Sequence, residues 1–221
     1  MADRKQGNGM LVLGLGRFGG AIAETLVNLG HEVLAVDFDH TIVQSYAGRL
    51  THVVEADTTN EDALRQIGAD EFDCAVVAIG TNIEASILTT SVLVDLGIPT
   101  IWAKAITKPH GRILERVGAT RVVLPEHEMG ERVAHIVAGQ ALNYIEFEDG
   151  FALVETKPPR EYVGQTLGQA GIRRQHGVTV VCIKRRGEDF SYATEDTVLG
   201  ADDLLIVAGK TELAERFAAR T

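Results

Sequence analysis

The sequence predicts an α/β fold, a doubly wound parallel sheet, followed by a small α+β domain. From residue 9 to about 125, short β-branched runs alternate with helical patterns. These runs are continuously apolar, which is typical of parallel strands covered by helices on both faces. Beyond about residue 141 the alternation ends and hairpin-like pairs of runs appear. The chain therefore divides into residues 1–125, a connecting helix at 126–141, and a second domain at 142–221.

The first domain contains six candidate strands, with a helix expected after each. The strands are expected at residues 10–15, 32–37, 52–55, 74–79, 100–104 and 121–124. The helices are expected near 18–29, 40–48, 60–67, 83–96, 108–117 and, beginning at Pro125, 125–140. A glycine follows four of these helices, where a left-handed C′ residue is common: Gly30, Gly68, Gly97 and Gly118. The apolar helix at 83–96 suits a subunit interface, although a helix buried within one domain would show the same pattern.

The second domain is expected to contain short strands and few helices. Strands are predicted at 144–147 and 151–156, joined by a turn at 148–150, and again at 178–184 and 203–207. A loop is expected at 157–160, a short helix at 166–170 and a terminal helix at 211–220.

Composition excludes several classes of function. The formal net charge of −10 argues against a nucleic-acid partner, because proteins that bind nucleic acids present a basic face. No apolar run is long enough to span a bilayer, and the first nine residues lack a signal-peptide core and suggest a short disordered lead. The two cysteines, Cys74 and Cys182, lie in apolar runs and indicate small buried side chains in a reducing cytosol.

A glycine motif marks the first turn of the sheet. Gly14, Gly16 and Gly19 form G-x-G-x-x-G between a strand and a helix, with Phe18 inside the loop. In this context the glycines allow a tight turn, close approach of a phosphate and close packing of the helix. Asp37 ends the second strand, where a carboxylate binds ribose hydroxyls and disfavours a 2′-phosphate. These features predict a Rossmann-like nucleotide site. The alternatives are a merely tight turn and a surface carboxylate.

Other candidate residues follow the remaining strands at the carboxyl edge of the sheet, where such folds bind ligands. This set comprises Asp39, Asp57, Thr58, Ala78, Ile79, Gly80, Asn82, Lys104 and Glu126. Asn82 would also serve as a plain helix cap, and Glu126 as a complement to a helix dipole.

Arg17, in the middle of the glycine loop, favours phosphate sensing over hydride transfer. A guanidinium can bind a terminal phosphate bidentately, although a surface arginine is the alternative. A dehydrogenase needs an acid–base group near the nicotinamide, and the histidines are scattered with no metal or triad spacing. The loop also lacks the Walker G-K-[ST] sequence. We therefore expect binding rather than catalysis.

Five segments, GLGRFG, HEVLAVD, AIGTNIEASILTT, IWAKA and RVVLPEHEMG, carry a family resemblance. The chain resembles the cytosolic regulatory RCK subunits of bacterial Ktr/Trk potassium uptake systems, most of all the Ktr type. The resemblance implies an RCK_N nucleotide domain and an RCK_C domain. It also implies a dimer-based octameric ring that docks, at the inner face of the cell membrane, on a membrane-embedded potassium-translocating subunit.

The resemblance also implies ligands and residue roles. ATP and ADP would compete for the cleft, NAD(H) would bind in some members, and ATP would bind with Mg²⁺ or Ca²⁺. Arg17 would contact the terminal phosphate, Asp37 the ribose, and Glu126 a divalent cation between two nucleotides at a dimer interface. ATP and ADP would then shift the ring between conformations, because only a ligand with unequal affinities can move an equilibrium.

A second effector site is expected in the C-terminal domain. Family members bind cyclic di-AMP there, and residues 172–177 align with their binding loop, which gives Arg173, Arg174 and His176 as candidates. This sequence has Ala193-Thr194 where Ala-Pro is expected, and a plain surface role is the alternative. Two other functions stay open: a small NAD(H)-dependent oxidoreductase, and a redox sensor that binds DNA, for which no basic face or helix-turn-helix is visible.

Overall fold

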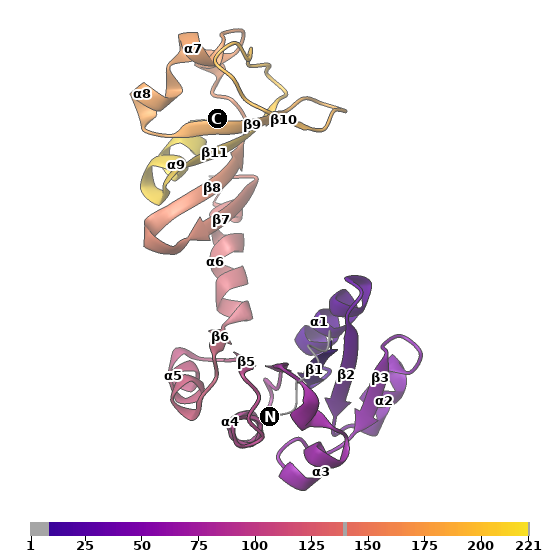
Figure 1. The fold of residues 1–221 in the computed structure, drawn as a ribbon. Helices are drawn as coiled ribbons and strands as arrows, with labels where there is room; N and C mark the ends of the chain where they lie inside the picture. Colours follow the sequence, from indigo (N-terminus) through magenta and orange to yellow (C-terminus); the bar gives the residue numbers. More distant parts are fainter. Residues whose placement is uncertain (1–8, 139–140, 221) are drawn as a thin grey trace, which may run out of the picture. The chain divides into compact units, whose positions relative to one another are not determined.

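The computed structural model describes residues 9–138 and 141–220. Two compact units divide the chain, Met1–Glu126 and His127–Thr221, and each is described by itself (Figure 1). Among the described residues, no helix is both long and apolar enough to cross a membrane.

The first unit is a parallel sheet. Its strands, within the described residues, are β1 (Gly9–Leu13), β2 (Glu32–Asp37), β3 (His52–Glu55), β4 (Cys74–Val77), β5 (Thr100–Lys104) and β6 (Arg121–Val123). The helices are α1 (Arg17–Asn28), α2 (His40–Tyr46), α3 (Glu61–Gln66), η1 (Ala69–Glu71), α4 (Ile83–Asp95) and α5 (Lys108–Val117). Helix α6 (Pro125–Val137) begins at the end of this unit, and from His127 on it belongs to the second unit. The strand order β3-β2-β1-β4-β5-β6, all parallel, confirms the doubly wound prediction.

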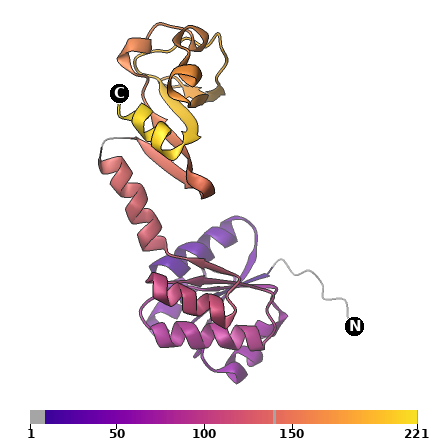
Figure 2. The same ribbon diagram turned by 90° about the vertical axis from the view of Figure 1, so that its left-hand side faces the viewer.

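Helices cover this sheet on both faces because its strands are apolar on both faces. Leu11 and Leu13 of β1 belong to a core with Leu64, Leu93 and Leu114 of α3, α4 and α5. Val12, between them, points to the other face and joins a core with α1 and α2. Figure 2 shows α4 and α5 side by side over one face of the strands.

The helices end at the glycines that the sequence predicts as their stops. The glycines at the four predicted stops all have positive φ, from +76° to +123°: Gly30, Gly68, Gly97 and Gly118. Helix α4 buries one face through Ser86, Thr89, Thr90 and Leu93. Ile83, Leu88 and Val94 of the same helix are exposed, so its apolar run is not buried all the way round.

The second unit is an antiparallel sheet with short helices, as predicted. Its strands, in the part of the chain that is described, are β7 (Asn143–Phe147), β8 (Phe151–Thr156), β9 (Thr179–Lys184), β10 (Phe190–Tyr192) and β11 (Leu204–Lys210). Its helices are η2 (Glu148–Gly150), η3 (Arg160–Tyr162), α7 (Leu167–Ala170), α8 (Ile172–His176) and α9 (Thr211–Ala218). The order is β10-β9-β11-β8-β7, over a core that includes Val154, Leu205 and Phe217.

Several details differ from the prediction. The exposed edge strand β10 and the helix α8 were not expected, and η3 begins inside the predicted loop. The helix expected at 125–140 ends at Val137, and residues 139–140 lie outside the described residues, as does most of the lead at 1–9. Cys74 and Cys182 are only partly buried, which corrects the prediction of buried cysteines.

Candidate functional site

The glycine loop is shaped by close backbone contacts. Gly14 has φ +93°, and its N–H donates to the Val36 carbonyl at 2.8 Å. A Cβ at Gly19 would lie 1.8 Å from the Gly14 carbonyl oxygen, so only glycine lets α1 approach the loop. A Cβ at Gly16 would meet nothing within 4 Å. Gly16 is also the N-cap of α1 without a side-chain cap, which leaves helix N–H groups open toward a ligand.

Helix α1 is also fixed on its other side. A Cβ at Gly20 would lie 1.8 Å from the hydroxyl oxygen of Tyr46, which ends α2. The adjacent glycines therefore face two different neighbours, the loop backbone and a tyrosine ring.

Asp37 holds the loop in place. One carboxylate oxygen accepts a hydrogen bond from the Leu15 N–H at 2.6 Å, and the other from the Asp39 N–H at 3.0 Å. Asp37 is 5% exposed and lines the cavity described below. Asp39 caps α2 by accepting from the N–H groups of Thr41 and Ile42. Asp37 thus joins the end of β2 to the glycine loop.

Polar residues after β3 and β4 are also engaged locally. Asp57 accepts from the N–H and hydroxyl of Thr59, and these hydrogen bonds, the hydroxyl's first, lower the pKa of its carboxyl. The hydroxyls of Thr58 and Thr89 are 2.8 Å apart and buried. Asn82 caps α4 by accepting from the Ala85 N–H, and it lines the cavity as well. The helix-cap role is therefore confirmed, while nucleotide binding by Asn82 stays a prediction.

Two charged residues meet beside the loop. The Lys104 Nζ at the end of β5 lies 2.6 Å from the Glu126 Oε1 in the first turn of α6. The Phe18 ring centroid is 5.5 Å from the same nitrogen. The hydrogen bond from Lys104 is the main cause that lowers the pKa of the Glu126 carboxyl, and the charge of Arg17 lowers it further. A phosphate at the loop would therefore meet two cations and one carboxylate.

A cavity of about 660 Å³ opens at the carboxyl edge of the sheet. Nine of the predicted site residues line it: Gly14, Gly16, Asp37, Asp57, Thr58, Ala78, Ile79, Gly80 and Asn82. The others lie in the loop, in the α2 cap or at the charged pair: Arg17, Phe18, Gly19, Asp39, Lys104 and Glu126. Seven lining residues were not predicted: Phe38, Ile42, Thr59, Thr81, Glu84, Ala85 and Leu88.

Phe38 is the most informative of the unpredicted lining residues. It directly follows Asp37, and it is 77% exposed at the cavity. The structure thus places an exposed apolar ring next to the buried Asp37 carboxylate at this cavity. Its signal was present in the sequence, as an aromatic residue just beyond a buried strand. Ile42 and Leu88 gave no such signal, because each lies on a helix whose orientation only the fold sets.

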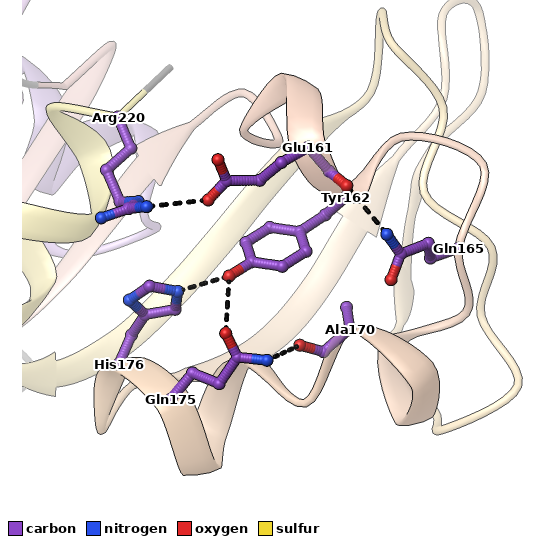
Figure 3. A network of polar contacts seen from close by, with 7 residues as sticks. All are labelled: Glu161, Tyr162, Gln165, Ala170, Gln175, His176 and Arg220. Atoms are coloured by element: carbon purple, nitrogen blue, oxygen red, sulfur yellow. Dashed lines mark hydrogen bonds and ion pairs between the residues drawn. The ribbon is translucent and has the colours of Figure 1, made fainter.

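In the second unit, a directional hydrogen-bond network holds α8 (Figure 3). The Gln175 amide donates to the Ala170 carbonyl at 3.0 Å, so its oxygen faces the Tyr162 hydroxyl, which donates to it at 3.1 Å. That hydroxyl has one proton, so the His176 Nε2, 2.7 Å away, must carry the hydrogen of that contact. Burial lowers the pKa of His176, and the Arg220 charge lowers it further.

The three predicted effector residues of this unit therefore separate into two kinds. Arg173 and Arg174 are exposed on α8, which Gly171 and Gly177 bracket with positive φ. His176 packs inward, with its ring 5.3 Å from the Phe217 ring. Residues 172–177 are thus largely a helical turn rather than a loop.

Comparison with known proteins assigns both units. Residues 10–125 match the TrkA-N domain and residues 151–221 match the TrkA-C domain. The chain is 38% identical over 207 residues to Ktr system potassium uptake protein A of Bacillus subtilis, covering 93% of each sequence. The chain belongs to the TrkA–Ktr family of potassium uptake proteins.

Other family relatives agree. This TrkA–Ktr chain is 41% identical over 210 residues to Ktr system potassium uptake protein C of Bacillus subtilis, covering 95% of each. It is 33% identical over 199 residues to Ktr system potassium uptake protein A of Vibrio alginolyticus, covering 90% of each. The similarity therefore extends over both units.

Solved structures share the fold. The RCK domain of GsuK matches 99% of this TrkA–Ktr chain with a TM-score of 0.67 and 19% identity. The GsuK channel bound to NAD matches with a TM-score of 0.68 and 19% identity. This chain spans 49% and 40% of the length of those chains.

Proposed function

We propose that this chain is a nucleotide-sensing regulatory subunit that gates a membrane potassium transporter. The observation that carries the proposal is the cavity at the carboxyl edge of the sheet, beside which stand the Lys104–Glu126 pair and Arg17. This arrangement accepts an adenosine and presents cations to its phosphates. The potassium uptake proteins to which the chain is 38–41% identical support the transport role.

The cavity residues suit the adenosine part of a nucleotide. The Asp37 carboxylate is held by two backbone N–H groups and keeps lone pairs for ribose hydroxyls. Phe38 covers the base, and the open N-terminus of α1 with Arg17 takes the phosphates. ATP, ADP and NAD(H) share this adenosine part, and solved GsuK channels are described as bound to NAD and to ADP. Discrimination then falls to the groups that face the phosphates.

Glu126 suits a divalent cation that is shared with nucleotide phosphates. Its carboxylate offers the hard oxygen that Mg²⁺ and Ca²⁺ prefer, and its side chain is 68% exposed. The described residues contain no group of three or more His, Cys, Asp or Glu side chains placed to hold a metal. Phosphate oxygens, or a second copy's Glu126, would therefore supply the remaining ligands of a cation at a dimer interface.

The remaining parts of the proposal concern assembly. Residues 1–125 sense the nucleotide, the segment 126–141, which contains most of α6, connects the two domains, and 142–221 form the second regulatory domain. The chain acts as a homo-oligomer, an octameric ring of dimers, at the cytoplasmic face of the membrane on a potassium-translocating subunit. The exposed side chains of Ile83 and Val94 on α4 supply apolar surface for such contacts.

The second effector belongs to the same proposal. Arg173 and Arg174 are exposed cations on a turn that the Tyr162–Gln175–His176 network holds rigid. They would contact the phosphates of cyclic di-AMP, while His176 supports the turn from inside. In this proposal the chain regulates transport and is not an enzyme, a role that its similarity to potassium uptake proteins supports.

Thermal unfolding in the presence of nucleotides tests the proposal. ATP with Mg²⁺ or Ca²⁺ should raise the Tm more than ADP or NAD(H) does, because at equal concentration the ligand that binds the folded state more tightly stabilises it more. Arg17→Ala should narrow the difference between ATP and ADP. Equal stabilisation by ATP and ADP, with NADH clearly best, would refute the gating function and favour an NAD(H)-dependent oxidoreductase or redox sensor.

A further inference from the structure

Lys104 is a confined cation. It ends β5 and is 8% exposed. A Cβ at Gly80 would lie 3.1 Å from its Nζ, so the ammonium is packed against the backbone of the loop that follows β4. A charge removed from water to this degree requires an anionic partner. The structure supplies one in Glu126, at 2.6 Å.

Glu126 is the accessible member of the pair. Its side chain is 68% exposed, against 10% for that of Lys104. It lies in the first turn of α6, so the ion pair joins the end of β5 to the start of that helix. From His127 on, α6 belongs to the second unit, within which Arg132 donates to the Asn143 side chain at 2.5 Å and the His135 ring stacks on the Tyr144 ring at 4.1 Å.

A phosphate at the glycine loop would compete with Glu126. The open N-terminus of α1, Arg17 and the Lys104 ammonium all attract a phosphate, while the Glu126 carboxylate repels it. Lys104 has three donors but one charge, and a second anion beside it weakens its hold on the first. Occupancy of the loop and retention of Glu126 are therefore opposed.

We propose that the Lys104–Glu126 ion pair is a latch, opened by nucleotide phosphates, that couples the glycine loop to helix α6. Without a divalent cation, the phosphate takes Lys104 and Glu126 is released. With a cation between phosphate and carboxylate, the repulsion is removed and Glu126 stays at the site. This inference rests on the proposed function. In it, Lys104 and Glu126 are the residues that position α6.

Nucleotide affinity without divalent cation gives the first test. In EDTA, Glu126→Gln in the full chain should raise ADP affinity about 5-fold or more by titration calorimetry, because the competing charge is gone; this corresponds to about 1 kcal/mol at 25 °C. Lys104→Met should lower it. Glu131→Gln is the matched control, because it removes a carboxylate from the same helix that pairs with His127 and not with Lys104. This variant should change the ADP affinity less than twofold. An unchanged or lowered affinity in Glu126→Gln would overturn the latch.

Hydrogen exchange along α6 gives a readout that a purely structural role would not move. Metal-free ADP should speed exchange of the amides at 128–131, the first that bond within α6, in the wild type, and Lys104→Met should show the faster exchange without nucleotide. Slow exchange in Lys104→Met would overturn the latch even if ADP binds. If the wild type binds neither ATP nor ADP, the proposed function itself fails, so the two failures are distinguishable.

Discussion

Substitution of Gly19 by alanine is expected to separate packing of the loop from binding. The new Cβ would lie 1.8 Å from the Gly14 carbonyl oxygen and 2.8 Å from the Ala78 Cβ. The first of these is a backbone atom in a turn that Gly14 fixes by a hydrogen bond to Val36. Neither neighbour is the flexible end of a side chain, so the start of α1 must move away from the sheet.

The cost follows from that geometry. Overpacking in a close-packed interior costs about 1–3 kcal/mol, and the 1.8 Å contact places Gly19→Ala at the upper end. For a unit of this size, 3 kcal/mol lowers the Tm by roughly 10 °C. Urea unfolding and differential scanning calorimetry of the full chain measure the loss directly.

Gly16→Ala is the matched control. Its Cβ would meet no atom within 4 Å, and Gly16 has φ −62° and ψ −173°, which alanine adopts freely. Stability should therefore change by less than about 0.5 kcal/mol. The methyl group projects into the open space expected for phosphate, so affinity for ADP should fall while the fold stays intact. A stable Gly19→Ala, or a Gly16→Ala that loses stability but keeps affinity, would refute this account of the loop.

Two further predictions concern buried polar groups. Asp37→Asn should lower the free energy of unfolding in urea by about 1–3 kcal/mol, because an amide has one acceptor oxygen for the N–H groups of Leu15 and Asp39. Asp39→Asn keeps a helix cap, so its free energy of unfolding should stay nearly the same. Equal losses in the two variants would contradict the role of Asp37 in holding the loop. Stability should also fall as the pH drops below about 6.5. Burial lowers the pKa of His110 and His176, so the unfolded chain binds more protons there and the stability present above 6.5 is lost toward the folded pKa. Unfolding at pH 7.5 and 5.5 tests this, His176→Gln should reduce the difference, and an unaltered slope in that variant would exclude His176 as a source.

The doubly wound sheet was predictable because its information is local. Strands such as β1 and β2 are apolar on both faces, and glycines such as Gly30 and Gly97 end the helices between them. The edge strand β10 was missed because Phe190, Ser191 and Tyr192 are all exposed and show no buried face. Helix α8 was missed because five residues between two glycines carry no apolar period.

The site was predictable in its parts more than in its contacts. Asp37, Lys104 and Glu126 could be predicted as site residues because each ends or follows a strand, and parallel strands bring their carboxyl ends to one edge of the sheet. No sequence pattern indicated that Lys104 and Glu126 pair, or that Asp37 binds the loop backbone. Those contacts depend on side-chain directions that the packing of α1 and the end of β5 determine.

The contact between Gly20 and the Tyr46 hydroxyl has a consequence for how this family diverges. A residue larger than glycine at position 20 cannot coexist with a tyrosine at 46, because its Cβ would lie 1.8 Å from the phenol oxygen. The two positions should therefore change together, with a larger residue on α1 accompanied by a smaller one at the end of α2. An alignment of relatives in which they vary independently would show that the two helices can shift apart.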